Sequence, residues 1–280
     1  MAELCMCYPG GLHKALTLSY DDGVEQDKKL IAIMVKHGLK GTFNLNSGIY
    51  APEGTVYPEG TIHRRMTEAE VSALYMANGM EVATHGYTHP FLSRLPAYVT
   101  TKEIVEDKRK LEEQFGCVVR GHAYPFGRFN DTVVDILKQS GIVYARTVRS
   151  THGFNLPENW LTLDPTCHHD DPELFELCDK FLKAQNDWGY PMMFYLWGHA
   201  YEFEDRDNWD RIEAFAEKMG GKEDIWYATN IEIYNYVQCF KQLRFTTDVT
   251  LVENPTATDL WFTYNCKSYM VKAGETLKIG

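Results

Sequence analysis

The sequence predicts an α/β fold with parallel strands, and three observations support this prediction. Short apolar runs alternate with longer segments of helical periodicity, a pattern typical of parallel sheets covered by helices. Polar clusters follow several of the predicted strands, at the edge of the sheet where barrels of this class place their chemistry. A chain of 280 residues with 44% hydrophobic content is long enough to fill one large core.

The elements follow one another as strand, helix, strand, helix. Strands are predicted at residues 14–19, 41–45, 80–84, 117–123 and 142–148, and helices at 26–37, 67–78, 99–115 and 130–140. The helix at 26–37 has apolar residues at a helical period and ends at Gly38. Thr67 and Glu70 have the spacing of a capping box, which marks the start of the next helix.

The pattern changes after about residue 238. Residues 243–280 are rich in β-branched and aromatic residues and show no helical period, which predicts a small antiparallel β extension. We therefore expect a main domain over residues 1–240 and a β-rich extension over 241–280. Because so short a segment makes a marginal independent module, the extension is expected to pack on the main domain and cap it.

Charge and composition exclude several classes of protein. The formal net charge is −11, from 39 acidic and 28 basic residues, which argues against a nucleic-acid partner. No apolar run approaches the length of a membrane span. The amino-terminal residues lack the basic and apolar regions of a signal peptide, and the seven cysteines have no framework spacing. These features predict a cytoplasmic protein with reduced thiols.

Two polar clusters contain the residue types of a metal centre. Residues 19–23 (Ser-Tyr-Asp-Asp-Gly) place Asp21 and Asp22 at a strand end, where one carboxylate can face a metal and the other a substrate or water. His85 and His89 are four residues apart, so both imidazoles can reach one cation. Two histidines and a carboxylate form a common catalytic zinc set, so His85, His89 and one of the two aspartates are candidate ligands. Taken singly, a polar turn and surface histidines explain the same residues.

Two further clusters follow later strands. Residues 123–127 (Ala-Tyr-Pro-Phe-Gly) permit a turn that can aim a backbone N–H at a substrate, although a plain strand-end turn explains them equally. Residues 194–199 form an apolar strand that ends in His199, which on its own is better explained as a packed histidine. Trp197 and Tyr201 lie near His199 in sequence, and Trp197 fits the core as well.

Residues 167–171 (Cys-His-His-Asp-Asp) also contain metal-ligand types. Neighbouring residues rarely chelate one ion well, and Asp-Asp-Pro is typical of a helix start. The sequence therefore favours a solvated loop over a second metal site here.

In their order along the chain, these clusters resemble the motifs of the polysaccharide deacetylases, the NodB-homology or carbohydrate esterase family 4 group. Residues 19–23 resemble its Thr-Phe-Asp-Asp-Gly motif, and residues 85–89 its His-Ser/Thr-x-x-His motif with glycine at the second position. Residues 123–127 resemble its Arg-x-Pro-Tyr/Phe-Gly motif. Residues 196–199 resemble its Leu-x-His motif with one extra residue. The resemblance covers roughly residues 10–235.

The resemblance implies an irregular (β/α) barrel and a role for each motif residue. Asp22, His85 and His89 would bind one divalent cation, with Zn²⁺ expected. Asp21 would act as general base and His199 as general acid. The backbone N–H of Phe126 would help hold the oxyanion. The implied substrate is an acetylated carbohydrate, for which the candidate contacts are Tyr124, Trp197 and Tyr201.

The sequence departs from the family pattern in two places. Ala123 stands where the family has the arginine that steadies the base, and Arg120, Arg128, Arg146 and Arg149 all remain open as its replacement. The spacing before His199 also differs. The missing arginine favours one rival function, a non-catalytic carbohydrate-binding protein on the same scaffold. A second rival, a hydrolase of a small non-sugar amide, also stays open because folds of this kind support it.

Overall fold

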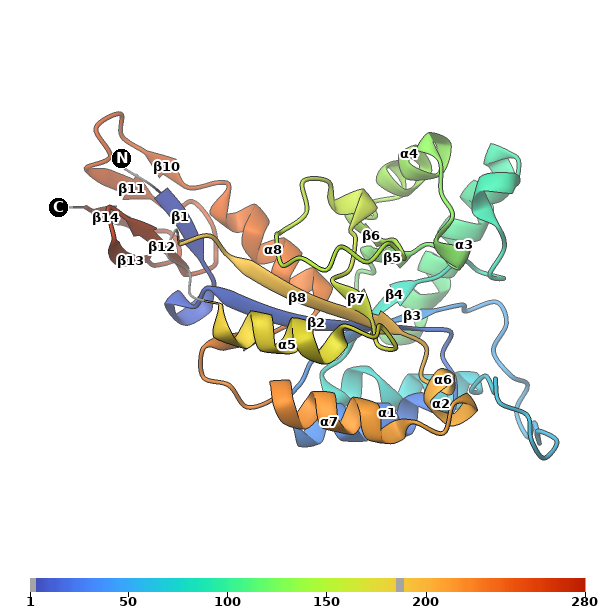
Figure 1. Ribbon diagram of the computed structural model, residues 1–280. Helices are drawn as coiled ribbons and strands as arrows, with labels where there is room; N and C mark the ends of the chain where they lie inside the picture. Colours follow the sequence, from blue (N-terminus) through green and yellow to red (C-terminus); the bar gives the residue numbers. More distant parts are fainter. Residues whose placement is uncertain (1–3, 185–188, 280) are drawn as a thin grey trace.

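The computed structural model describes residues 4–184 and 189–279. Its strands include β2 (Lys14–Asp21), β3 (Gly41–Leu45), β4 (Glu81–Thr84), β5 (Gly121–Ala123), β6 (Tyr144–Arg146), β7 (Cys167–His168), β8 (Met192–Gly198) and β9 (Ile225–Tyr227). In the described part of the chain these form one eight-stranded sheet in the order β6-β5-β4-β3-β2-β8-β7, with β9 beside the first half of β2 (Figure 1). All of its strand pairs are parallel, so the predicted fold class is confirmed.

Helices lie on the outside of this curved sheet, as Figure 1 shows. Their bounds are α1 (Asp27–Lys36), α2 (Glu68–Leu74), α3 (Ala97–Phe115), α4 (Asp131–Gln139), α5 (Leu174–Lys183), α6 (Tyr201–Asp205), α7 (Trp209–Met219) and α8 (Asn230–Phe240). The predicted capping box is present: the Thr67 hydroxyl accepts the Glu70 N–H, and the Glu70 carboxylate accepts the Thr67 N–H at 2.9 Å. Helix α2 is shorter than predicted, since a separate 3₁₀ turn covers Met76–Asn78.

The barrel is irregular because no regular strand pairing joins β6 to β7. Residues 147–166 cross this gap as a largely irregular segment. A single parallel bridge joins Arg146 to Leu163, and the Thr166 N–H donates to the carbonyl of Tyr195 at 2.9 Å. The irregular (β/α) barrel that the motifs implied is thereby confirmed.

The centre of the sheet is buried on both faces. Every residue of β2 and β3 is buried, and the largest hydrophobic cluster joins Leu18, Phe43 and Phe194 to the apolar faces of the helices. Continuous burial explains why these strands read as apolar runs rather than as alternating patterns. The core therefore holds the strand ends in fixed positions.

Small antiparallel sheets cover the amino-terminal end of the barrel. Their strands are β1 (Leu4–Cys7), β10 (Arg244–Phe245), β11 (Leu251–Glu253), β12 (Leu260–Tyr264), β13 (Lys267–Val271) and β14 (Thr276–Lys278). They form the sheets β1-β12-β13 and β10-β11-β14, which confirms the β-rich extension. One hydrophobic cluster unites Phe262 and Val252 of the extension with Ala15 and Met193 of the barrel.

The sequence did not reveal β1. Its residues pair with β12, more than 250 positions away, in the register Cys5 to Thr263 and Cys7 to Trp261. The extension therefore includes both termini of the described chain (Figure 1), and the boundary at residue 240 stays a prediction.

Strand β5 is also shorter than expected, beginning at Gly121 rather than at 117. Within the described ranges, none of the helices combines the length and apolar character needed to cross a bilayer.

Candidate active site

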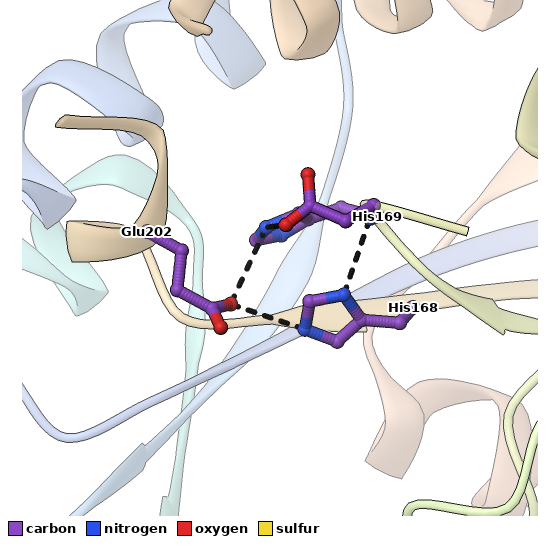
Figure 2. Close-up of side chains that lie close together, drawn as sticks. His168, His169 and Glu202 are labelled. Atoms are coloured by element: carbon purple, nitrogen blue, oxygen red, sulfur yellow. Dashed lines mark hydrogen bonds and ion pairs between the residues drawn. The ribbon is translucent and has the colours of Figure 1, made fainter. Parts of the chain in front are cut away.

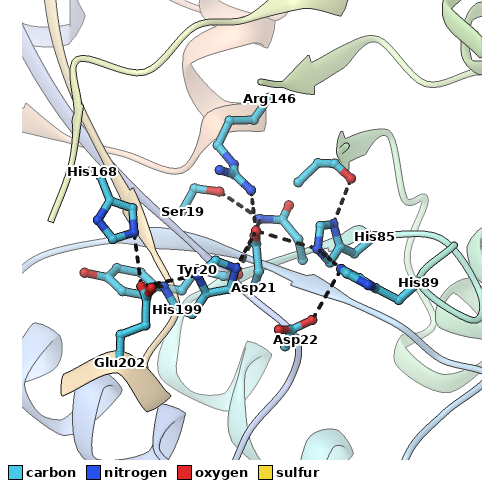
Figure 3. A network of polar contacts seen from close by, with 12 residues as sticks. Ser19, Tyr20, Asp21, Asp22, His85, His89, Arg146, His168, His199 and Glu202 are labelled. Carbon is cyan, nitrogen blue, oxygen red and sulfur yellow. Dashed lines mark hydrogen bonds and ion pairs between the residues drawn. The ribbon is translucent and has the colours of Figure 1, made fainter. Parts of the chain in front are cut away.

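The polar side chains predicted from sequence come together at the carboxyl ends of the parallel strands (Figure 3). Asp21 ends β2, His85 follows β4, Arg146 ends β6 and His199 follows β8. Because parallel strands present their carboxyl ends at the same edge, residues far apart in sequence become neighbours there. The Nε2 atoms of His85 and His199 lie 3.6 and 3.7 Å from Oδ2 of Asp21.

Asp22, His85 and His89 form a compact group whose ligand atoms lie within 4.8 Å of one another. The Nε2 atoms of the two histidines are 3.2 Å apart, and Nε2 of His89 lies 3.8 Å from Oδ1 of Asp22. Asp22 and His89 have φ values of 82° and 58°, a conformation that non-glycine residues adopt at some energetic cost. The backbone is thus bent to bring these three side chains to one point.

The orientation of His85 leaves a lone pair facing this point. Its Nδ1 lies 2.8 Å from the carbonyl oxygen of Ala123 and donates to it, so Nε2 of the neutral ring carries no proton. Its backbone N–H donates to the buried carboxyl of Asp107 at 3.0 Å. Burial lowers the pKa of His85 and brings that of His89 to about 4. Both rings are therefore neutral at physiological pH, as metal ligands must be.

Asp22 supplies the negative charge of the group. Its Oδ2 lies 3.1 Å from Nε2 of His63, and its Oδ1 lies 3.2 Å from Nη2 of Arg65. Burial opposes ionisation, but these partners and the other imidazoles outweigh it and lower the pKa of Asp22 well below its usual value. One carboxylate and two neutral imidazole nitrogens fit a divalent cation such as Zn²⁺. No motif marks His63 or Arg65, so sequence reasoning missed both.

Asp21 is paired with Arg146, one of the four arginines that the sequence left open. The guanidinium donates to Oδ2 of Asp21, and both side chains are almost completely buried. Asn44 donates to Oδ1 at 2.8 Å. Burial alone raises the pKa of Asp21, but Arg146 and the nearby imidazoles lower it below its usual value. Arg120 and Arg149 point elsewhere, to Asn235 and Asp164 respectively.

We expect Arg146→Met to weaken both the fold and the base. Breaking a buried ion pair costs about 3–5 kcal/mol, because the remaining charge stays buried without a partner. The pKa of Asp21 should rise without the guanidinium, which moves the acid limb of the activity profile to higher pH. Chemical denaturation and the pH dependence of kcat/KM measure the two effects. Arg120→Met, at a half-buried arginine that makes no contact with Asp21, is the control; an acid limb at the same pH in both variants contradicts this role.

His199 is held by Glu202, a residue that sequence reasoning also missed. Oε2 of Glu202 lies 3.2 Å from both Nδ1 and the backbone nitrogen of His199, and 3.0 Å from Nε2 of His168. Burial lowers the pKa of His199, but the Glu202 hydrogen bond and the carboxylates of Asp21 and Asp22 raise it above its usual value overall. This arrangement favours a protonated imidazole beside Asp21 (Figure 3).

The candidate substrate contacts have three different environments. Tyr124 is 1% exposed, and its hydroxyl donates to the carbonyl of Leu161 at 2.7 Å, so the structure does not present it to a substrate. Trp197 is largely buried with the Arg146 guanidinium 4.3 Å from its ring, which supports the arginine. Tyr201 is half-buried, with its ring 5.3 Å from that of His199.

Phe126 lies beside the group formed by Asp22, His85 and His89. Its ring is 49% exposed, stacks on Phe91 at 3.9 Å and meets the ring of His89 edge-on at 4.5 Å. Its φ of 57° belongs to a tight turn closed by the Gly127 N–H, which donates to the carbonyl of Tyr124 at 2.8 Å. The turn that residues 123–127 predicted is therefore present at the edge of the site.

Comparisons with known proteins give a consistent picture. Residues 10–145 match the family model described as polysaccharide deacetylase. The uncharacterized protein YlxY of Bacillus subtilis is 28% identical over 123 residues, which are 43% of this chain and 34% of that protein. The chain thus matches only about a third of the length of this curated relative.

Solved structures share the fold. A putative polysaccharide deacetylase from Mycobacterium smegmatis has 18% identity and a TM-score of 0.59, over 85% of this chain and 94% of that chain. Peptidoglycan deacetylase PdaC from Bacillus subtilis has 16% identity and a TM-score of 0.52, over 82% of this chain and 94% of its own. At this level of identity, these likenesses support the fold.

Proposed function

Residues 10–145 match the polysaccharide deacetylase family model, and on that premise we propose that the protein is a metal-dependent hydrolase that removes acetyl groups from a carbohydrate. The observation that supports this most strongly is the convergence of Asp21, Asp22, His85, His89 and His199 at one strand edge. Asp22, His85 and His89 would hold the cation. A divalent cation held there supplies a Lewis acid that makes a water molecule more acidic and polarises an acetyl carbonyl.

Asp21 is proposed as the general base. Its lowered pKa keeps it ionised at neutral pH, and Arg146 and Asn44 fix the orientation of its carboxylate. An ionised carboxylate next to the metal ligands can take a proton from water as that water attacks the acetyl carbon. Close placement of base and ligands is also what lets one water contact both.

His199 is proposed as the general acid. Its Nδ1 is directed to Glu202, which leaves Nε2 facing Asp21 and the reacting groups. Protonated at Nε2, it can donate to the departing nitrogen or oxygen when the bond to the acetyl group breaks. The backbone N–H of Phe126 is proposed to stabilise the oxyanion, and Tyr201 and the exposed Phe126 and Phe91 rings to contact the sugar.

Glu202→Gln is expected to shift the basic limb of the pH profile. The carboxylate raises the pKa of His199, so its neutral replacement lowers that pKa, and the acid loses its proton at lower pH. The basic limb of kcat should then move to lower pH. Glu204→Gln is the matched control, because Glu204 pairs with Arg64 and Gln26 instead. A basic limb that stays in place would remove Glu202 from this role.

The case for a non-catalytic sugar-binding protein depended on Ala123 at the position of the family's arginine. Arg146, on the strand β6 that pairs with the strand of Ala123, contacts Asp21 instead. The missing arginine at position 123 therefore no longer favours a non-catalytic protein. Hydrolysis of a small amide remains an outcome of the test rather than a second proposal.

The test is acetate release from a panel of N-acetylated and O-acetylated sugars and small acetamides, with metal content measured on the same protein. Release from at least one acetylated sugar, abolished by a chelator and restored by added Zn²⁺, is the expected result. Metal bound at the Asp22 group without release from any substrate supports the binding-protein alternative. Release from the small acetamides alone supports the alternative of a hydrolase of a small non-sugar amide.

A further inference from the structure

A second cluster of metal-ligand side chains includes His168, His169 and Glu202 (Figure 2) and adjoins His199 through Glu202. It consists of His168, His169, Asp170 and Glu202, whose ligand atoms lie within 4.8 Å of one another. Nε2 of His169 is 3.3 Å from Oε2 of Glu202 and 3.4 Å from Oδ2 of Asp170. These donor-to-donor distances match those at the Asp22 group, where the two Nε2 atoms are 3.2 Å apart. The sequence disfavoured a metal site here because residues 167–171 are neighbours in the chain. Glu202, from α6, adds a ligand from a distant element.

His169 is buried in this cluster without a hydrogen bond to its ring from the part of the chain that the structure describes. It is 1% exposed, and neither ring nitrogen forms a hydrogen bond within the described residues. Its ring stacks on Tyr20 and Phe203 at centroid distances of 5.7 and 4.1 Å. A Cβ on Gly198 would lie 2.0 Å from its Nδ1, so this glycine makes room for the ring. A buried imidazole without hydrogen bonds is costly, and here Nε2 lies close to two carboxylates.

His168 has a different role in the cluster. The Asp170 N–H donates to its Nδ1 at 3.1 Å, so the proton of the neutral ring sits on Nε2. That proton is donated to Oε2 of Glu202 at 3.0 Å. His168 therefore orients the carboxylate, and the lone pairs available to a cation belong to His169, Asp170 and Glu202.

The side chain of Arg206 marks where positive charge is favoured. Its guanidinium contacts Oδ2 of Asp170 and lies 3.3 Å from Oε1 of Glu202. The Arg206 side chain is 44% exposed, so it can move into solvent while the fold stays unchanged. Asn208 donates to the other oxygen of Asp170 at 3.2 Å, and Arg211 donates to the carbonyl of His169 at 2.7 Å, which hold the loop in place.

We propose that His169, Asp170 and Glu202 form a second divalent-cation site, which a transition metal ion such as Zn²⁺ enters by displacing the Arg206 guanidinium. One imidazole and two carboxylates suit such an ion and leave a coordination position for water. This site shares no ligand with the Asp22 group, although Glu202 also contacts His199; the cation would bind whether or not the proposed function holds.

The test is equilibrium dialysis of the chelator-stripped, full-length chain against increasing free Zn²⁺, with bound metal counted per chain. The wild-type protein should bind two equivalents. His85→Ala should lose only the equivalent of the Asp22 group, and Asp170→Asn only the second one. Asp179→Asn, which removes an exposed carboxylate paired with Lys218, is the matched control and should bind two.

Arg206→Gln separates a metal site from a simple arginine site. Removing a unit charge about 4 Å away should tighten the second equivalent about fivefold or more. If the wild type and Arg206→Gln both bind one equivalent, lost in His85→Ala, then Arg206 is the permanent cation of the cluster and the proposal fails. The proposal also fails if Asp170→Asn still binds the second equivalent. Because asparagine has the size of aspartate and keeps the contact with Asn208, this variant is expected to keep the fold. His169→Gln is an independent check, because this variant should also lose the second equivalent of metal.

Discussion

Asp21→Asn is expected to reduce acetate release by about 10²–10⁴-fold, the usual contribution of a general base. The substitution keeps the size of the side chain and the hydrogen bond from Asn44 but removes the ability to accept a proton. Asp22, His85 and His89 are unchanged, so the variant should bind metal as the wild type does. Initial rates and metal content, measured on the same preparation, check both statements.

Asp224→Asn is the control for this prediction, because Asp224 pairs with Lys14 at the amino-terminal end of the sheet. It should leave the rate unchanged. A near wild-type rate in Asp21→Asn would show that another group takes the proton. A lost metal ion would mean that Asp21 is itself a ligand.

His85→Ala should lose both the metal and the activity. His85 is fixed by the Ala123 carbonyl and by Asp107, so its Nε2 is a preorganised donor. Loss of an outer partner weakens metal binding by about 10–100-fold, and loss of a ligand should exceed that range. Competition with a chromophoric chelator measures the affinity.

His37→Ala, at the end of α1 and remote from the site, controls for the loss of an imidazole. Unchanged metal affinity in His85→Ala would remove His85 from the ligand set. Activity without metal would refute the proposed metal dependence as a whole.

Local signals made most of the fold predictable. The helical period of residues 26–37 and the Thr67–Glu70 capping box depend only on near neighbours, and both are present. Strand β1 was not predictable in this way, because its partner β12 is more than 250 residues away and so short a segment has no period of its own.

In the site too, the residues that belong to local sequence patterns were predictable, and those that act through long-range contacts were not. The spacing of His85 and His89 and the Asp21-Asp22 pair are local patterns, and the structure brings them together. Arg146, His63 and Glu202 act through contacts that only the folded sheet creates. Tyr124 was a predicted substrate contact because of its place within a motif, but its side chain is buried and its hydroxyl donates to the carbonyl of Leu161.

The proposed function depends most on Asp22, His85 and His89 holding a divalent cation. The most direct measurement is anomalous X-ray diffraction at the zinc edge on crystals of the protein loaded with one equivalent of Zn²⁺. We predict one strong peak at about 2.0–2.2 Å from Oδ of Asp22 and from Nε2 of both histidines. No peak there, or a peak only beside His169 and Glu202, would contradict the claim.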